Sequence, residues 1–126
     1  YDTNRAGSAA DCSQMDRVTL GIQAHAAALG LQFLQGSGFP APWSSGVAIA
    51  LHGSWNRETP SGDKVILVPF VTGGQQPSPA IDLVRGWTGS DGKYWGRPVD
   101  VAGDPGGGLL ISDDASGTIY RLSRSP

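Results

Sequence analysis

The sequence contains a single cysteine, Cys12, in 126 residues. One cysteine excludes a disulfide within the chain and any metal site built from cysteines. Charged side chains are also scarce, at 16%, and 9 basic against 11 acidic residues leave a net charge of −2. This balance excludes the broad basic surface that nucleic-acid-binding proteins present. We therefore expect no nucleic-acid partner.

Long apolar segments are missing as well. No run approaches the roughly 20 apolar residues that cross a bilayer as a helix, so we expect no membrane-spanning segment. The first five residues, Tyr1 to Arg5, include neither an initiator methionine nor the apolar centre of a secretory signal. We therefore expect the sequence to begin inside a longer protein or after processing.

Glycine and proline, by contrast, are abundant, with 19 and 9 residues. Such a composition argues against a helical bundle and favours many turns between short strands. The hydrophobic content of 39% is too high for a disordered chain. The composition thus favours a folded β-rich domain.

Seven short segments are predicted to form strands, because each is apolar or alternating and is bounded by turn residues. They are residues 30–34, 47–51, 64–71, 80–87, 98–102, 109–112 and 118–122. In residues 20–34 several alanines favour a helix, but Gly21 and Gly30 interrupt the segment, and we prefer a loop that leads into a strand. Short strands joined by such turns predict an all-β fold of antiparallel strands.

A polar and aromatic segment, His52–Arg57, directly follows the most apolar of these strands. Functional side chains often lie on loops that a rigid strand holds in place. The segment is therefore a candidate site. The alternative is structural: Trp55 would pack on the core and His52 would bond to the backbone.

A second candidate segment, Trp95–Asp100, precedes a predicted strand. The planar guanidinium of Arg97 can bind a carboxylate or a phosphate through two parallel hydrogen bonds. The alternative is a surface ion pair between Arg97 and Asp100, with Trp95 as a packing anchor.

Asp113 and Asp114 occupy a turn after another predicted strand. Their oxygens could hold Ca²⁺, although aspartates in turns more often accept hydrogen bonds from backbone N–H groups. A serine hydrolase is disfavoured because the Gly-x-Ser-x-Gly turn is missing. A zinc site is disfavoured because no spacing supplies a third ligand beside His25 and His52.

Four segments, in this order, resemble the C-terminal part of the glucose/sorbosone dehydrogenase family. They are residues 24–31, 52–57, 95–101, and 112–114 with 117–121. Members of this family are quinoproteins that use pyrroloquinoline quinone (PQQ) to oxidise sugars. The resemblance implies a C-terminal segment of a PQQ-dependent sugar dehydrogenase, periplasmic or secreted, that contributes part of the quinone and substrate pocket.

The resemblance also implies a six-bladed β-propeller, of which this chain would supply about two blades in one partial domain, residues 1–126. Residues 20–71 would form the first blade-like unit and residues 80–126 the second. Residues 1–19 are polar without a clear period and would form an extended arm or loop. A faint internal repeat, in which an apolar strand, a glycine-containing turn and another strand follow one another, agrees with two similar units.

Several side chains receive roles from this resemblance. Arg97 matches an arginine that contacts the cofactor, and His52 lies near a position where some relatives present a lysine to the quinone. Arg57 is assigned to the same cofactor-binding group. His25 and Trp55 are expected to line the substrate site.

PQQ and Ca²⁺ are the cofactors that the resemblance implies, and a sugar is the substrate. No catalytic residue and no metal ligand is assigned here, because the catalytic base and the main calcium ligands of the family resemble segments upstream of this chain. Two departures are visible: Ala28 replaces a proline of sorbosone-type relatives, and Val99 replaces a second arginine of the glucose-oxidising branch.

A wedge of two blades would leave an apolar flank and unpaired sheet edges. We therefore expect the missing blades to come from another chain, or copies of this chain to associate. Two other functions stay open: a non-catalytic propeller-type binding module, and an oligomeric β-protein that binds carbohydrate. The second would use the four tryptophans, whose rings suit stacking on sugars: Trp43, Trp55, Trp87 and Trp95.

Overall fold

Two antiparallel sheets make up the computed structural model of the chain, which describes residues 13–16, 18–41, 43–55, 57–70 and 76–124. These residues form seven strands and no helix. The prediction of an all-β fold of short antiparallel strands is therefore confirmed. Within the same residues, no helix is long and apolar enough to cross a membrane.

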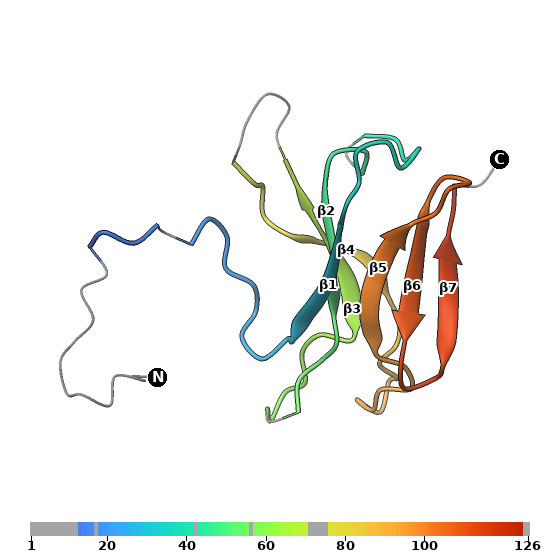
Figure 1. Cartoon of the computed structure of the whole chain (residues 1–126). Coiled ribbons are helices and arrows are strands. Elements are labelled where there is room, and N and C mark those ends of the chain that lie inside the picture. Colours follow the sequence, from blue (N-terminus) through green and yellow to red (C-terminus); the bar gives the residue numbers. More distant parts are fainter. Residues whose placement is uncertain (1–12, 17, 42, 56, 71–75, 125–126) are drawn as a thin grey trace.

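The first sheet has four strands in the order β1-β2-β3-β4, and the second has three in the order β5-β6-β7. Figure 1 shows the two sheets side by side, each built from strands that are consecutive in the chain. The strands are β1 (Ala28–Phe33), β2 (Gly46–Leu51), β3 (Lys64–Pro69), β4 (Ile81–Arg85), β5 (Pro98–Gly103), β6 (Leu109–Asp113) and β7 (Thr118–Leu122).

The alanine-rich segment 20–34 is a loop followed by β1, as the sequence analysis preferred. Two non-glycine residues of this loop, His25 and Ala27, have positive φ angles of 63° and 51°. A residue with a left-handed backbone turns the chain sharply and interrupts a right-handed helix. The helical propensity of the alanines is therefore overridden by the loop geometry.

β4 pairs with β3 and completes the first sheet. Its residues fall within the range 80–126 that the sequence analysis assigned to the second unit. Short-range turn signals do not reveal this pairing, because they show where a strand ends and not which neighbour it joins. The assignment of the two sheets to propeller blades stays a prediction.

The main hydrophobic core lies between the two sheets. Alternate residues of β2 and β3 face the second sheet, since successive side chains of a strand point to opposite faces. This buried cluster contains Leu34, Ala48, Ala50, Val65, Leu67, Trp87, Val101, Leu109 and Ile111. The inner faces of the sheets are thus joined by burial of apolar surface.

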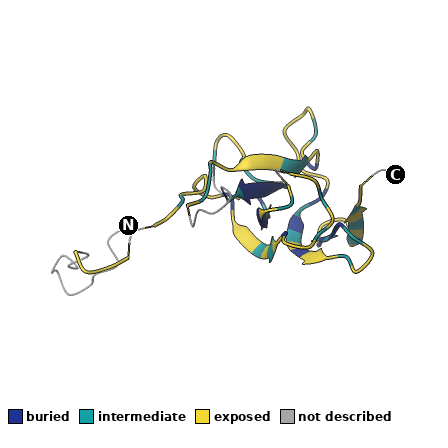
Figure 2. Cartoon of the chain, turned by 90° about the horizontal axis from the view of Figure 1, so that it is seen from above, coloured by how far each residue is buried: buried dark blue, intermediate teal, exposed yellow. Residues whose placement is uncertain are grey.

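The other face of the first sheet is apolar too. A second cluster covers it and includes Ala26, Val47, Leu51, Ile66 and Val68, with Leu20, Ile49 and Phe70 packed against them. Strands buried on both faces consist of continuous apolar residues, which is why β2 and β3 lack alternation. Figure 2 shows the buried central strands in dark blue, between exposed segments.

β1 forms one edge of this sheet and is less buried than β2 and β3. Leu29, Leu31 and Phe33 keep 49%, 55% and 60% of their surfaces exposed. The segment before β1 runs away from the sheets in Figure 1, and the residues described in 13–19 are largely exposed. Residues 1–12 and 17 of the expected arm lie outside the described residues.

The two sheets approach each other closely where β1 passes β5. A Cβ atom placed on Gly30 would overlap the Cα atom and the carboxylate of Asp100. Backbone cannot move aside as a flexible side chain can, so only glycine fits at this position. Gly103 of β5 offers a matched contrast, because a Cβ there would meet no atom within 4 Å.

We expect Gly30→Ala to destabilise the chain by about 1–3 kcal/mol, the usual cost of overpacking. Gly103→Ala should change the free energy of unfolding by less than about 0.5 kcal/mol, as is typical of surface substitutions. Urea denaturation followed by tryptophan fluorescence measures both values. Equal effects of the two substitutions would contradict the close approach of β1 and β5.

Candidate functional site

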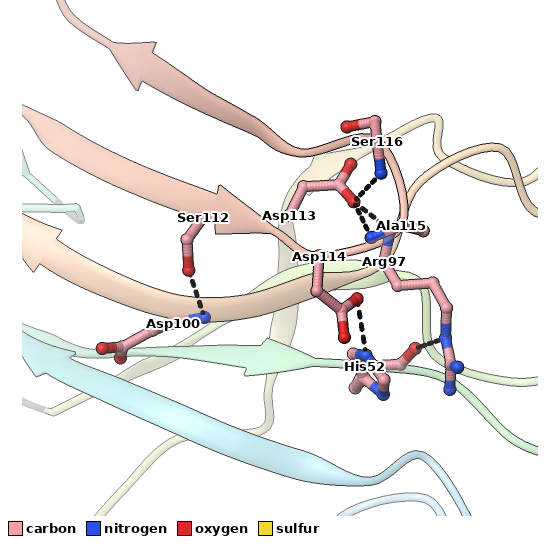
Figure 3. A network of polar contacts seen from close by, with 8 residues as sticks. All are labelled: His52, Arg97, Asp100, Ser112, Asp113, Asp114, Ala115 and Ser116. Atoms are coloured by element: carbon pink, nitrogen blue, oxygen red, sulfur yellow. Dashed lines mark hydrogen bonds and ion pairs between the residues drawn. The ribbon is translucent and has the colours of Figure 1, made fainter.

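The candidate site lies where three strand-end segments meet at one edge of the two sheets. His52 follows β2, Arg97 precedes β5, and Asp113 ends β6 just before Asp114. Figure 3 shows these four side chains close together, although they come from both sheets. The structure therefore brings together two of the predicted segments and the turn that follows β6.

Arg97 is held by three separate contacts. Its backbone N–H donates to Oδ1 of Asp113 (2.8 Å), and its Nε donates to the carbonyl oxygen of His52 (3.0 Å). The guanidinium carbon lies 5.0 Å from the centre of the Tyr94 ring, a cation–π distance. Within the described residues neither Nη group has a hydrogen-bond partner. Arg97 thus combines a fixed position with two free Nη groups, which carry four N–H donors.

His52 is fixed through one ring nitrogen. Its Nε2 lies 3.0 Å from Oδ1 of Asp114, and its side chain is only 16% exposed. In a neutral His52 ring whose proton is on Nε2, Nε2 donates the hydrogen bond to Asp114, and Nδ1 is left as an acceptor. Nδ1 has no partner among the residues that the structure describes.

Asp113 organises the turn after β6. Its Oδ1 accepts hydrogen bonds from the backbone N–H groups of Ala115 and Ser116 (3.0 Å each), besides that of Arg97. Its Oδ2 accepts one from the hydroxyl of Tyr120 (3.2 Å). Burial alone would raise the pKa of Asp113, but the hydrogen bonds from Arg97, Ser116 and Tyr120 outweigh it and hold the pKa below its ordinary value.

The sequence allowed two roles for Asp113 and Asp114, calcium binding or acceptance of backbone hydrogen bonds. The structure shows the second role for Asp113. Asp114 instead pairs with His52. Among the described residues no group of three or more His, Cys, Asp or Glu side chains could hold a metal ion. Asp113 and Asp114 are thus engaged with backbone N–H groups and with His52.

Arg57 holds a neighbouring loop. Its Nε donates to the carbonyl oxygen of Thr59 and its Nη1 to that of Ala24, both at 3.0 Å. The backbone N–H groups of His52 and Gly53 also donate to carbonyl oxygens of this loop, at residues 27 and 26. Arg57 is thus engaged with backbone, and its predicted role toward the cofactor stays a prediction.

His25 belongs to the loop that Arg57 clamps, and its side chain is exposed. Its left-handed backbone is of the kind that occurs at binding sites, where the surroundings impose it. The structure therefore places the loop of His25 beside the segment of His52. A role of His25 toward substrate stays a prediction.

The tryptophans divide into one core residue and three exposed ones. Trp87 is only 3% exposed and packs in the core between the sheets. Trp55 is 87% exposed, so the alternative in which it packs on the core is wrong. Trp43 and Trp95 are also exposed, and Nε1 of Trp95 donates to the carbonyl oxygen of Gly86 (2.8 Å).

The alternative ion pair between Arg97 and Asp100 does not form. The carboxylate of Asp100 accepts a hydrogen bond from the N–H of Val101 (2.8 Å), and its own N–H donates to Oγ of Ser112. Asp100 therefore supports the strand that starts after Arg97 and does not neutralise it.

Three residues of the site were missed by sequence reasoning: Asp63, Thr88 and Tyr94. Asp63 is buried, and Thr88 donates to its Oδ2 (3.1 Å). Burial raises the pKa of Asp63, while Thr88 and the charges of Arg97 and His52 oppose the rise. A Gly-Asp pair in a hairpin resembles an ordinary turn, so nothing local signals this burial.

A family model described as TrAA12-like matches residues 1–125. The chain belongs to the TrAA12-like family.

Named relatives of this TrAA12-like chain include a PQQ-dependent pyranose dehydrogenase of Coprinopsis cinerea, 29% identical over 84% of the chain. An uncharacterized protein of Borreliella burgdorferi is 34% identical over 80% of it. An iodide structure of a Trichoderma reesei member of carbohydrate-active enzyme family AA12 aligns with a TM-score of 0.73 at 26% identity, covering 98% of this chain. The holo form of the Coprinopsis PQQ domain aligns with a TM-score of 0.55 at 28% identity, covering 79%.

The TrAA12-like chain spans only part of each relative. It covers 27% of the Borreliella protein, 16% of the Coprinopsis dehydrogenase and 32% of the Trichoderma structure. The predicted relation to PQQ-dependent sugar dehydrogenases is confirmed at this broad level. The matches are to AA12 and pyranose dehydrogenase proteins and not to the glucose/sorbosone branch specifically.

The donors of this TrAA12-like site fit PQQ, a planar quinone that carries carboxylates. Such a ligand needs fixed cationic donors, and a guanidinium with both Nη groups free can bind a carboxylate end-on through these two groups. Arg97 supplies this group within reach of the solvent.

We expect Asp113→Asn to destabilise the chain by about 1–3 kcal/mol, because a buried acceptor of several hydrogen bonds loses its charge. The pKa of Asp113 is lower in the folded state than in the unfolded chain. The charged carboxylate therefore stabilises the fold fully above the ordinary pKa of an aspartate. This stabilisation is lost as the pH falls through the folded-state pKa. The difference between the two proteins should therefore shrink in acid.

Urea denaturation at neutral and acidic pH measures this difference. Asp91→Asn is the matched control, since Asp91 is exposed and accepts one local hydrogen bond, from the N–H of Lys93. A destabilisation by Asp113→Asn that stayed constant down to low pH would disprove the role given to the charge.

Proposed function

We propose that this chain is a segment of a PQQ-dependent sugar dehydrogenase and forms one wall of the pocket for the quinone and the sugar. The observation that carries the proposal is Arg97: His52 and Tyr94 fix its guanidinium, Asp113 holds its backbone N–H, and both Nη groups are free. PQQ-related relatives support the choice of ligand. The chemistry that PQQ supplies when bound is the two-electron oxidation of a sugar carbon.

The residues of this chain bind and orient. The Nη groups of Arg97 would neutralise a carboxylate of the cofactor, while the Nε bond to His52 keeps the guanidinium plane from turning. His52, held by Asp114, would offer Nδ1 to a ligand. Because a fixed donor loses little conformational entropy on binding, these contacts favour affinity and a single orientation.

The two sheets, in this proposal, are two blades of a six-bladed β-propeller in a periplasmic or secreted protein. The apolar outer face of the first sheet, with Leu29, Leu31 and Phe33, would be covered by a blade from another chain or by a second copy. Exposed apolar patches of this kind commonly mark such contacts.

This proposal assigns no acidic side chain of the described residues to Ca²⁺. A calcium structure of the Trichoderma AA12 protein is among the similar structures, whereas within the described residues Asp113 and Asp114 are engaged as described above.

The proposal predicts that Arg97→Ala weakens PQQ binding about 10- to 100-fold, because a hydrogen bond to a charged group contributes about 1.5–3 kcal/mol. Quenching of tryptophan fluorescence during PQQ titration measures the affinity. Arg97→Lys should lose part of it, since lysine keeps the charge without the planar pair of donors.

Arg85→Ala is the control, because Arg85 is an exposed arginine at the end of β4. Its affinity for PQQ should equal that of the unchanged protein. Absence of PQQ binding to the unchanged chain, or equal affinity of Arg97→Ala, would refute the proposal.

A non-catalytic carbohydrate-binding module is the second candidate, and the exposure of Trp55 favours it. Trp55 lies in the segment after β2 with 87% of its surface exposed. An aromatic ring there could stack on a sugar. This candidate requires sugar binding without PQQ.

We expect Trp55→Ala to lower the affinity for the sugar about 10-fold, the order of a lost aromatic contact. The free energy of unfolding should change little, because the ring is exposed. Calorimetric titration with aldoses, with and without PQQ, separates the two candidates: sugar binding that needs PQQ supports the dehydrogenase. Unchanged sugar affinity of Trp55→Ala would remove this ring from either site.

A further inference from the structure

A buried carboxylate lies behind the candidate site and has no part in the proposed ligand contacts. Asp63 precedes β3, and only 6% of its surface is exposed. Its φ angle of 49° is left-handed, a conformation that aspartate tolerates better than most residues. A buried carboxylate in this backbone conformation is costly unless its surroundings hold it.

The carboxylate joins two loops. Its Oδ2 accepts the hydrogen bond from Oγ1 of Thr88 (3.1 Å), which belongs to the segment between β4 and β5. The group lies directly against Gly53, where a Cβ atom would overlap Oδ1 of Asp63. Asp63, at the end of the β2–β3 connection, thus packs between Gly53 at the start of the same connection and the segment that leads to Arg97.

Gly53 connects this packing to Arg97. Its φ angle of 105° is open to glycine and strained for other residues. The peptide that joins His52 to Gly53 carries the carbonyl oxygen that accepts the Nε–H of Arg97 (3.0 Å). The N–H of this peptide donates to the carbonyl oxygen of Ala26 (3.0 Å), and the carboxylate of Asp63 lies against Gly53 on its Cβ side. The two contacts together limit the orientations of the peptide, and with them the position of its carbonyl oxygen.

We propose that Asp63 is a positioning residue for Arg97: its Thr88-bound carboxylate holds the His52–Gly53 peptide so that the carbonyl oxygen fixes Nε and leaves both Nη groups free for an anionic ligand. The inference rests on the proposed function only for the identity of that ligand. The arrangement of Asp63, Gly53 and Arg97 can be tested without any ligand. In this proposal the carboxylate of Asp63 acts through its shape and its hydrogen bond with Thr88.

The first experiment measures hydrogen exchange of the Arg97 Nε–H by nuclear magnetic resonance, with the signal assigned by its loss in Arg97→Lys. Asp63→Ala and Thr88→Val should speed this exchange about 3- to 10-fold, the effect of weakening one hydrogen bond. Asp63→Asn should keep the slow exchange of the unchanged protein, because asparagine has the same shape and its oxygen still accepts from Thr88.

The Nε–H of Arg57, which donates to Thr59 in the same molecule, is the internal control and should exchange equally in all variants. Equal exchange of Arg97 in all variants would overturn the inference. So would Asp63→Asn behaving like Asp63→Ala, since the charge alone would then matter. If Asp63→Ala fails to fold, Thr88→Val and Asp63→Asn still decide.

The second experiment titrates the same variants with PQQ. Thr88→Val should weaken binding about 3- to 10-fold, in step with the exchange of Arg97, and Asp63→Asn should bind as the unchanged protein does. Unchanged PQQ affinity in Thr88→Val, together with faster exchange, would overturn the link to ligand binding. Failure of the unchanged chain to bind PQQ would refute the proposed function, while the exchange experiment would still test Asp63.

Discussion

Face-to-face packing of the two sheets is the constraint on which the rest of the structure depends. Burial of their inner faces brings the ends of β2, β5 and β6 to one edge, so that His52 of the first sheet meets Arg97 of the second. Neither sheet alone would hold the guanidinium. The close approach at Gly30 brings the backbones of β1 and β5 together, and the Nε bond of Arg97 joins the sheets again at the site.

Two buried carboxylates with opposite pKa shifts support this arrangement from different sides. Asp113 receives several hydrogen bonds and is stabilised in its charged form, so its pKa is lowered. Asp63 receives one hydrogen bond, from Thr88, and burial dominates, so its pKa is raised. The difference follows from the number of donors that each carboxylate meets. Both act on Arg97, one directly and the other, in our proposal, through Gly53.

The first sheet buries apolar side chains on both of its faces, whereas an antiparallel sheet that faces water on one side normally alternates. The exposed side chains of β1 extend the outer cluster toward solvent. This chain covers only 27% of the Borreliella protein and 32% of the Trichoderma structure.

The amino-acid sequence by itself determined the all-β class, the seven strands and the candidate segments around His52 and Arg97, because strand periodicity, turn residues and short motifs are local signals. Tertiary structure alone decided that β4 joins the first sheet, that Arg97 bonds to His52 and not to Asp100, and that Asp63 is buried. Each of these depends on contacts between residues distant in the chain. Which donor reaches which acceptor is set by how the sheets pack, and no local pattern records it.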